Sequence, residues 1–146
     1  MGRKNFVHLF LACILAVAVF AWAAPVQAAS GKIIIVSLRW QRLYAYQGNR
    51  LVYWAPVNAR GTRIGTFRIQ NKLGLVGSVI PGWRLSYWMG IYYVGRIQNG
   101  IHGPEIGRYG RVIATTSLSC VVMRRYADAA WIYRWTTVGT LVSIRR

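Results

Sequence analysis

The stretch RLYAYQGNRLVYW, residues 42–54, decides the fold class of this chain of 146 residues. Residues 42–46 alternate between polar and apolar side chains, and residues 51–54 form a second β-prone run. The pair Gly48-Asn49 between them is typical of a tight turn, so the stretch predicts a β-hairpin. Pro56 follows and is expected to end the second strand or to bend it at a sheet edge.

On both sides of this hairpin the chain stays rich in β-branched and aromatic residues, with glycines between them. These runs predict further strands, and residues 61–65 and 103–110 are expected to be loops. Residues 73–87 contain three glycines and a proline and are expected to be the least regular segment. The further strands are expected at 32–38, 66–70, 88–94, 96–102 and 140–144.

One helix is expected late in the chain, over residues 125–135. Apolar side chains recur there at a spacing of four, at Ala127, Trp131 and Trp135. Asp128 stands in the first turn, where a carboxylate interacts favourably with the helix dipole. No repeat, low-complexity segment or linker divides the chain, so we expect one mostly β domain with one late α-helix.

Residues 1–28 have the organisation of a signal peptide. Two basic residues precede a stretch, residues 6–24, that is apolar apart from one histidine, and residues 26–28 (VQA) resemble a cleavage site. We expect cleavage after Ala28, which leaves a domain of residues 29–146. Nineteen residues approach the length of a membrane span, so an uncleaved anchor is the alternative. In both cases we expect an extracytoplasmic protein that is secreted, periplasmic or associated with the cell wall.

The charge of the domain is strongly unbalanced. The chain has a formal net charge of +17, and about +15 remains beyond residue 28, where Glu105 and Asp128 are the only acids. Such a charge predicts affinity for anionic surfaces, here anionic wall polymers or a membrane surface that would meet an Arg-rich face. The basic residues are scattered and the leader indicates export, so no nucleic-acid partner is expected.

Beyond the leader the chain has one cysteine, Cys120, and one histidine, His102. They are the minimum equipment for cysteine catalysis, because a histidine can take the thiol proton and return it to a leaving amine. A catalytic cysteine is expected to have a lowered pKa, since the thiolate is the attacking species. Spacing alone nevertheless favours a small buried cysteine and a structural histidine.

Other chemistries find no support in the residues. One histidine, one cysteine and two isolated acids make no metal site, so no metal is expected. The same two acids offer no carboxylate pair for glycoside hydrolysis. Residues 61–65 (GTRIG) lack the length and the lysine of a phosphate-binding loop, and no cofactor is expected.

Several segments resemble, in order, those of one known family. Residues 41–44 (QRLY) look like its opening strands, and residues 61–67 (GTRIGTF) look like its glycine-rich turn without the proline. Residues 128–133 (DAAWIY) and 138–144 (VGTLVSI) look like its closing helix and strand. The family is the L,D-transpeptidase catalytic domain, or YkuD domain. The resemblance covers nearly all of residues 32–144 and implies a YkuD-like β-sandwich with one late α-helix.

The signature of that family is a His-Gly or His-Ser pair followed at a distance by Ser/Thr-His-Gly-Cys-x-Arg. By resemblance, Cys120 is the nucleophile, His102 is its base, and the carbonyl of Gly103 orients the imidazole. Ser117 takes the Ser/Thr place, and the backbone N–H groups of Ser119 and Cys120 would form the oxyanion hole.

Three positions depart from the signature. Leu118 replaces the second histidine, which leaves His102 in place. Ser119 replaces the glycine beside the nucleophile, where a Cβ is expected either to crowd the backbone near the carbonyl or to strain a positive φ. Val122 replaces the arginine and removes a charged group from the site.

The resemblance implies an exported, cysteine-dependent L,D-transpeptidase that acts on peptidoglycan stem peptides. A thioester on Cys120 would carry the acyl group to the amine of a second stem and so form a cross-link. The alternative is a catalytically impaired YkuD-fold domain that binds anionic cell-wall material. A third interpretation is a basic membrane-surface protein with an uncleaved leader.

Overall fold

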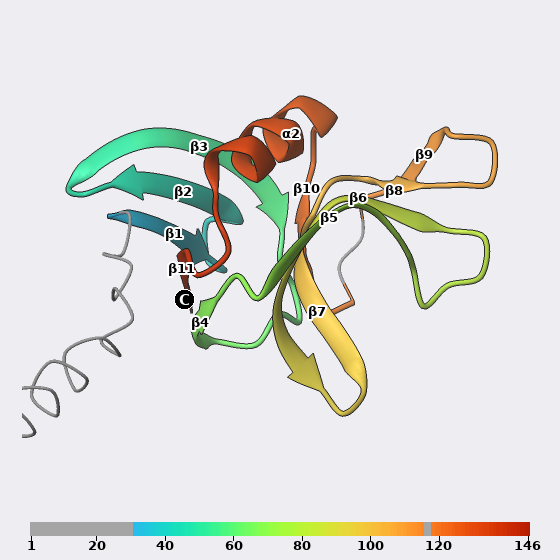
Figure 1. Ribbon diagram of the computed structural model, residues 1–146, viewed down its shortest axis with the longest axis horizontal. Helices are drawn as coiled ribbons and strands as arrows, with labels where there is room; N and C mark the ends of the chain where they lie inside the picture. Colours follow the sequence, from blue (N-terminus) through green and yellow to red (C-terminus); the bar gives the residue numbers. More distant parts are fainter. Residues whose placement is uncertain (1–30, 116–117) are drawn as a thin grey trace, which may run out of the picture.

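The computed structural model describes residues 31–115 and 118–146, and within them eleven strands form one continuous mixed sheet (Figure 1). Its path is β4-β11-β1-β2-β3-β10-β7-β6-β8-β9, with β5 paired to β6 beside that path. A mostly β fold with one late helix is therefore confirmed. The signal-peptide prediction for residues 1–28 lies outside the described residues. The strands are β1 (Lys32–Ser37), β2 (Arg42–Gln47), β3 (Arg50–Asn58), β4 (Gly65–Arg68), β5 (Asn71–Gly77), β6 (Arg84–Val94), β7 (Ile97–His102), β8 (Glu105–Ile106), β9 (Val112–Ala114), β10 (Val121–Met123) and β11 (Leu141–Arg145).

The predicted hairpin is formed by β2 and β3, which pair antiparallel, with Gly48 at a φ of 58° in the turn. The prediction that Pro56 ends the second strand is wrong, because β3 continues to Asn58. Pro56 is the last residue of β3 that pairs with β2, and the following Val57 and Asn58 pair with β10. The missing N–H of proline thus falls where the strand changes partners.

Residues 73–87 are not irregular, and that expectation is also wrong. β5 and β6 form a long antiparallel pair joined by a turn over residues 78–83. The glycines within β5, Gly74 and Gly77, have no atom within 4 Å of an ideal Cβ, so each has open space beside it. Pro81 and Gly82 mark the turn itself. The expected loop at 103–110 likewise contains the short strand β8.

The helix α2 (Tyr126–Trp135) confirms the late helix, with Arg125 as its N-cap residue. It packs on β6 and β10 and buries Ala129, Ala130 and Ile132. No described helix has the length and apolarity needed to cross a membrane. Helix α2 and the two halves of the sheet enclose a common hydrophobic core. This core includes Ile34, Leu43, Met89, Ile101, Val121 and Ile144.

Candidate active site

His102 ends β7 and is almost completely buried, with 2% of its surface exposed. Its ring lies against the indole of Trp88, with 5.9 Å between ring centroids and 23° between planes. Its Nδ1 lies 2.6 Å from the carbonyl oxygen of Gly103. Because a carbonyl only accepts hydrogen bonds, Nδ1 carries the proton and Nε2 keeps its lone pair.

Burial lowers the pKa of His102 from 6.5 to about 4, although the hydrogen bond to Gly103 acts in the opposite direction. The imidazole is therefore neutral at pH 7. A neutral imidazole with an available Nε2 can act as a base.

Cys120 directly precedes β10, and β10 runs parallel to β7. In that register Val122 lies opposite His102, so the imidazole at the end of β7 and the thiol directly before β10 are brought to neighbouring strands. Both residues line one cleft of about 620 Å³, together with Ser119. The structure thus brings three of the predicted site residues together, while Ser117 lies outside the described residues.

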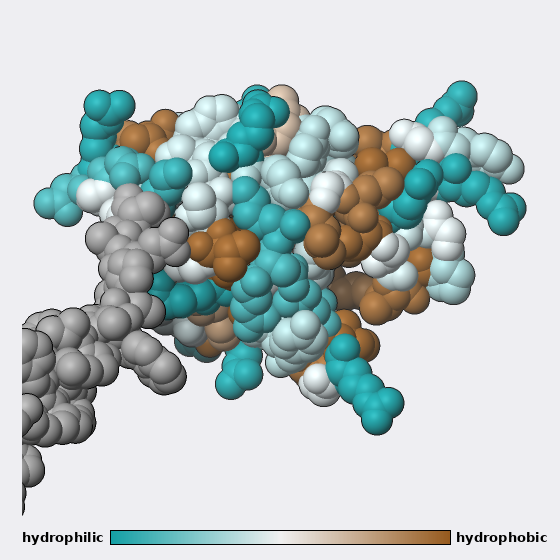
Figure 2. Space-filling model, viewed as in Figure 1, coloured by the Kyte–Doolittle hydropathy of each residue, from teal (hydrophilic) through white to brown (hydrophobic). Residues whose placement is uncertain are grey.

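The walls of this cleft are mostly apolar. Figure 2 shows apolar side chains gathered over the region that β5, β6 and β7 occupy in Figure 1. The charged groups that line the cleft are Arg96 and Glu105, and Glu105 is 6% exposed. The apolar lining consists of Leu73, Val76, Val79, Ile80, Leu85, Trp88, Ile97 and Leu118.

Burial also has the largest effect on the pKa of the Cys120 thiol. It raises the pKa of Cys120 above the ordinary 9.0, and the charge of Glu105 acts in the same direction. A hydrogen bond from the backbone of Gly100 lowers the pKa in part. The lowered pKa expected of a catalytic cysteine is thus not found, because desolvation outweighs the hydrogen bond. The resting pair is a neutral thiol and a neutral imidazole.

The loop that carries the thiol is held by backbone carbonyls. The carbonyl oxygen of Ser119 accepts a hydrogen bond of 2.7 Å from the hydroxyl of Tyr92, and that of Cys120 accepts one of 2.9 Å from Thr62 Oγ1. Gly61 has a φ of 79°, and a Cβ there would lie 2.8 Å from the carbonyl oxygen of Leu118. The glycine-rich turn therefore packs against the nucleophile loop and supports its position.

The departures from the family signature are accommodated in different ways. Among the described residues, the non-glycine positions with a positive φ are Gln41 and Tyr87, so Ser119 bears no such strain. Val122 is completely buried in the core-facing strand β10, and Leu118 is 71% exposed at the rim of the cleft. The expectation of a strained positive φ at Ser119 is therefore wrong.

Asn99 is a polar residue of the cleft that the sequence did not indicate. It lies on β7 and is 3% exposed. Its Oδ1 accepts a hydrogen bond from the hydroxyl of Ser119, and the sulfur of Cys120 lies 3.8 Å from the same oxygen. In a regular strand, side chains at positions 99 and 102 point to opposite faces, so no strand pattern would group them.

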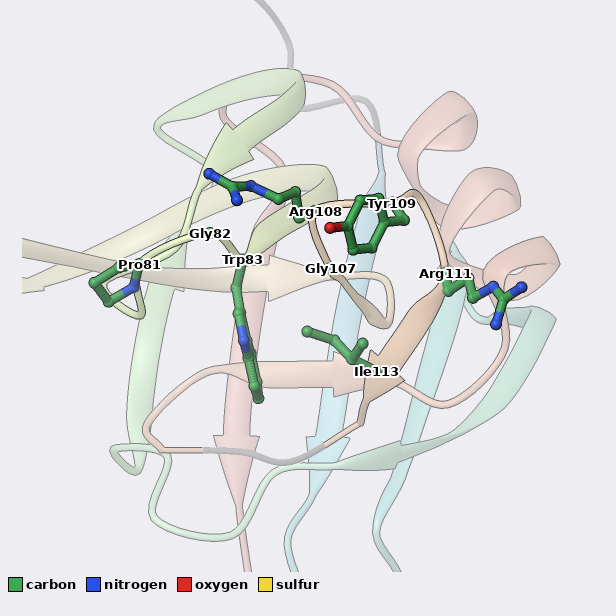
Figure 3. Close-up of a pocket in the computed structure, with 8 residues that line it drawn as sticks. All are labelled: Pro81, Gly82, Trp83, Gly107, Arg108, Tyr109, Arg111 and Ile113. Carbon is green, nitrogen blue, oxygen red and sulfur yellow. The ribbon is translucent and has the colours of Figure 1, made fainter.

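A second cavity of about 540 Å³ lies between the β5–β6 turn and the loop that joins β8 and β9 (Figure 3). In Figure 3, Arg108 extends toward the Pro81–Gly82 turn and Arg111 points to the opposite side. None of the eight described residues that line it is acidic, and in the described part of the chain no group of three metal-binding side chains occurs. The lining also includes Trp83, Gly107, Tyr109 and Ile113.

Comparison with known proteins gives the following similarities. The family model of the L,D-transpeptidase catalytic domain, YkuD, matches residues 31–144. An L,D-transpeptidase from Mycobacterium smegmatis is 15% identical, with a TM-score of 0.63 over 79% of this chain and 58% of that chain. An L,D-transpeptidase from Stackebrandtia nassauensis is 21% identical, with a TM-score of 0.64 over 85% of this chain and 61% of that chain.

An LD transpeptidase solved in complex with imipenem is 18% identical, with a TM-score of 0.64 over 78% of this chain and 58% of that chain. This chain thus spans about three fifths of the length of these solved proteins. No curated protein sequence matches it.

Proposed function

Since this chain belongs to the family of L,D-transpeptidase catalytic domains, we propose that it is an exported, cysteine-dependent transpeptidase of peptidoglycan stem peptides. The observation that supports this most is the common cleft of Cys120 and His102, which two parallel strands bring together from positions eighteen apart. The orientation of His102 by the Gly103 carbonyl adds to it.

In the first half-reaction, the sulfur of Cys120 attacks the carbonyl carbon of the diamino-acid residue in a donor stem. The thiol proton passes to Nε2 of His102 as the carbon–sulfur bond forms. The tetrahedral intermediate then loses the terminal D-amino acid, whose nitrogen takes the proton back from His102. A thioester on Cys120 remains.

In the second half-reaction, an amine of another stem attacks the thioester carbonyl. His102 takes a proton from that amine and returns it to the departing sulfur, which restores the neutral pair. The product is a new amide bond between two stems. Water in place of the amine would give a carboxypeptidase.

The resting protonation states suit this sequence. A raised pKa of Cys120 and a lowered pKa of His102 both disfavour an ion pair before substrate binds. The proton is therefore transferred during attack, as in general-base catalysis, and the Gly100 N–H stabilises charge that develops on sulfur. The backbone N–H groups of Ser119 and Cys120 are our prediction for the oxyanion hole.

A carbapenem tests the proposal directly, because acylation needs the nucleophile and its base but no second stem. Intact-mass analysis of the folded protein should show one covalent adduct, which Cys120→Ala abolishes and His102→Gln slows. Circular dichroism confirms folding of each sample. An unmodified, folded wild-type protein after long incubation would contradict the proposal.

A second candidate function is binding of anionic cell-wall material. The observation that favours it is the second cavity, whose lining includes Arg108 and Arg111 as well as the aromatic residues Trp83 and Tyr109 (Figure 3). Aromatic rings can stack on sugar rings, and guanidinium groups pair with phosphate or carboxylate.

Sedimentation with purified anionic wall polymer tests this candidate. Arg108→Glu and Trp83→Ala should weaken binding, whereas Arg50→Glu, an exposed arginine at the start of β3, is the matched control. Equal losses in Arg108→Glu and Arg50→Glu, with none in Trp83→Ala, would show only a general charge effect. Cys120→Ala should bind normally, which separates binding from catalysis.

Export and its mode are part of the proposal. N-terminal sequencing of the protein recovered outside the cytoplasm distinguishes the two forms of the leader. Ala29 as first residue indicates cleavage, and an intact leader indicates an anchor at the membrane surface.

A further inference from the structure

The side chain of Asn99 connects the strand that carries the base to the loop that carries the nucleophile. Its Oδ1 accepts a hydrogen bond from the Ser119 hydroxyl and lies 3.8 Å from the sulfur of Cys120. The amide is nearly inaccessible, so these partners are held in a desolvated place where hydrogen bonds are strong.

The next residue, Gly100, allows β7 to lie close to β6. A Cβ at Gly100 would collide with the carbonyl oxygen of Met89 and would press on the ring of Trp88, so only glycine fits there. Its backbone hydrogen bond reaches the thiol. Residues 99 and 100 thus contact the sulfur from one side of the cleft.

We propose that Asn99 is a positioning residue for the Cys120 thiol, acting both directly and through Ser119. This inference rests on the proposed function. Ser119 stands where the family signature has glycine, and its hydroxyl gives this chain a hydrogen bond that glycine cannot make. The hydrogen bond between Ser119 and Asn99 therefore fixes the nucleophile loop through a side chain, whereas a glycine at position 119 would leave only backbone contacts to fix it.

An amide suits both protonation states of the thiol. In the resting state Oδ1 faces the S–H group and the Ser119 hydroxyl. When the proton leaves for His102, rotation of the amide presents Nδ2–H to the sulfur, and the hydroxyl can accept as well as donate. A carboxylate of the same shape has no such donor and adds a negative charge beside the thiolate.

The pH dependence of Cys120 alkylation by iodoacetamide tests this role without requiring transpeptidase activity. Asn99→Asp should raise the midpoint of the profile by about one pH unit or more, and alkylation at neutral pH should slow about tenfold. The other ionisable groups of the cleft, His102, Arg96 and Glu105, are identical in both proteins. Asn71→Ala, which removes a half-buried amide of β5 outside the cleft, should leave the profile unchanged.

A double-mutant cycle tests the part played by Ser119. Asn99→Ala and Ser119→Gly should each slow carbapenem acylation, and the double variant should be little slower than Asn99→Ala alone. Additive effects would overturn action through Ser119, and an unshifted profile in folded Asn99→Asp would overturn the positioning role altogether. If Asn99→Ala does not fold, the isosteric Asn99→Asp carries the test.

These results are distinguishable from failure of the proposed function. A shifted alkylation profile together with no carbapenem adduct in the wild type would leave the positioning of the thiol intact and remove the transpeptidase. An adduct in the wild type together with an unshifted alkylation profile in Asn99→Asp would support the transpeptidase and remove the positioning role of Asn99.

Discussion

The hydroxyl of Tyr92 lies 2.7 Å from the carbonyl oxygen of Ser119 and donates a hydrogen bond to it, which ties the nucleophile loop to β6. The same hydroxyl accepts a hydrogen bond of 3.2 Å from the backbone N–H of Arg63. One buried side chain thus connects β6, the glycine-rich turn and the residue before Cys120. The position of the thiol therefore depends on groups that take no part in the chemistry.

Tyr92→Phe should destabilise the protein and slow acylation of Cys120. The change leaves the Ser119 carbonyl and the Arg63 N–H without this partner in a buried place, and we expect a loss of about 1–3 kcal/mol. Chemical denaturation measures the loss, and carbapenem acylation measures the reactivity. Tyr93→Phe is the control, because Tyr93 is 54% exposed, and equal effects in both variants would contradict the argument.

Gly100→Ala should be strongly destabilising, because the added methyl collides with the backbone of Met89. Overpacking of this kind costs about 1–3 kcal/mol, and the displaced strand should also slow Cys120 alkylation. Gly74→Ala in β5 is the matched control, since no atom lies within 4 Å of its Cβ position. Thermal denaturation that places both variants at the same midpoint would refute the steric explanation.

The stability of the protein should fall as the pH falls from about 6.5 toward 4. The unfolded chain protonates His102 with a pKa near 6.5, whereas burial lowers the pKa in the folded state to about 4. Between these values the unfolded state binds more protons, which costs roughly 3 kcal/mol of folding free energy in total. Denaturation curves at several pH values should show this loss in the wild type and a smaller one in His102→Gln.

Asp128→Ala should loosen the start of α2. Asp128 is 2% exposed and accepts a hydrogen bond of 2.8 Å from the hydroxyl of Tyr53 and two from the guanidinium of Arg125. Arg125 is mostly exposed, so the hydrogen bond to Tyr53 should dominate the loss, about 1–3 kcal/mol. Arg134→Ala, in the last turn, should cost less than 1 kcal/mol. Urea denaturation of both variants compares them.

The elements that local patterns determine were predictable from the sequence. The hairpin of β2 and β3 follows from alternation around Gly48-Asn49, and α2 follows from apolar residues at a spacing of four. β5 was missed because Gly74 and Gly77 resemble loop residues when their neighbours in space are unknown. Their place in a strand depends on pairing with β6, which a pattern along the chain does not contain.

The residues of the candidate site also fall into those that the sequence predicted and those that it did not. Cys120 and His102 were indicated by residue type and by resemblance, because one thiol and one imidazole are conspicuous in this composition. The residue type of Asn99 does not single it out in the sequence. Its side chain lies near the thiol because β7 and β10 pair in a parallel register. The direction of the Cys120 pKa shift was also beyond prediction, since it depends on how deeply the cleft desolvates the sulfur.

The pairing of β1 with β11 sets the order in which this domain can be completed. Ile33 lies beside Leu141, so β1 can complete its pairing only after a strand far along the chain has been synthesised. β4 also pairs with β11, and it too remains without its neighbour until then. β1 and β4 therefore complete their pairing only after β11 has been synthesised, whereas the hairpin of β2 and β3 can form earlier.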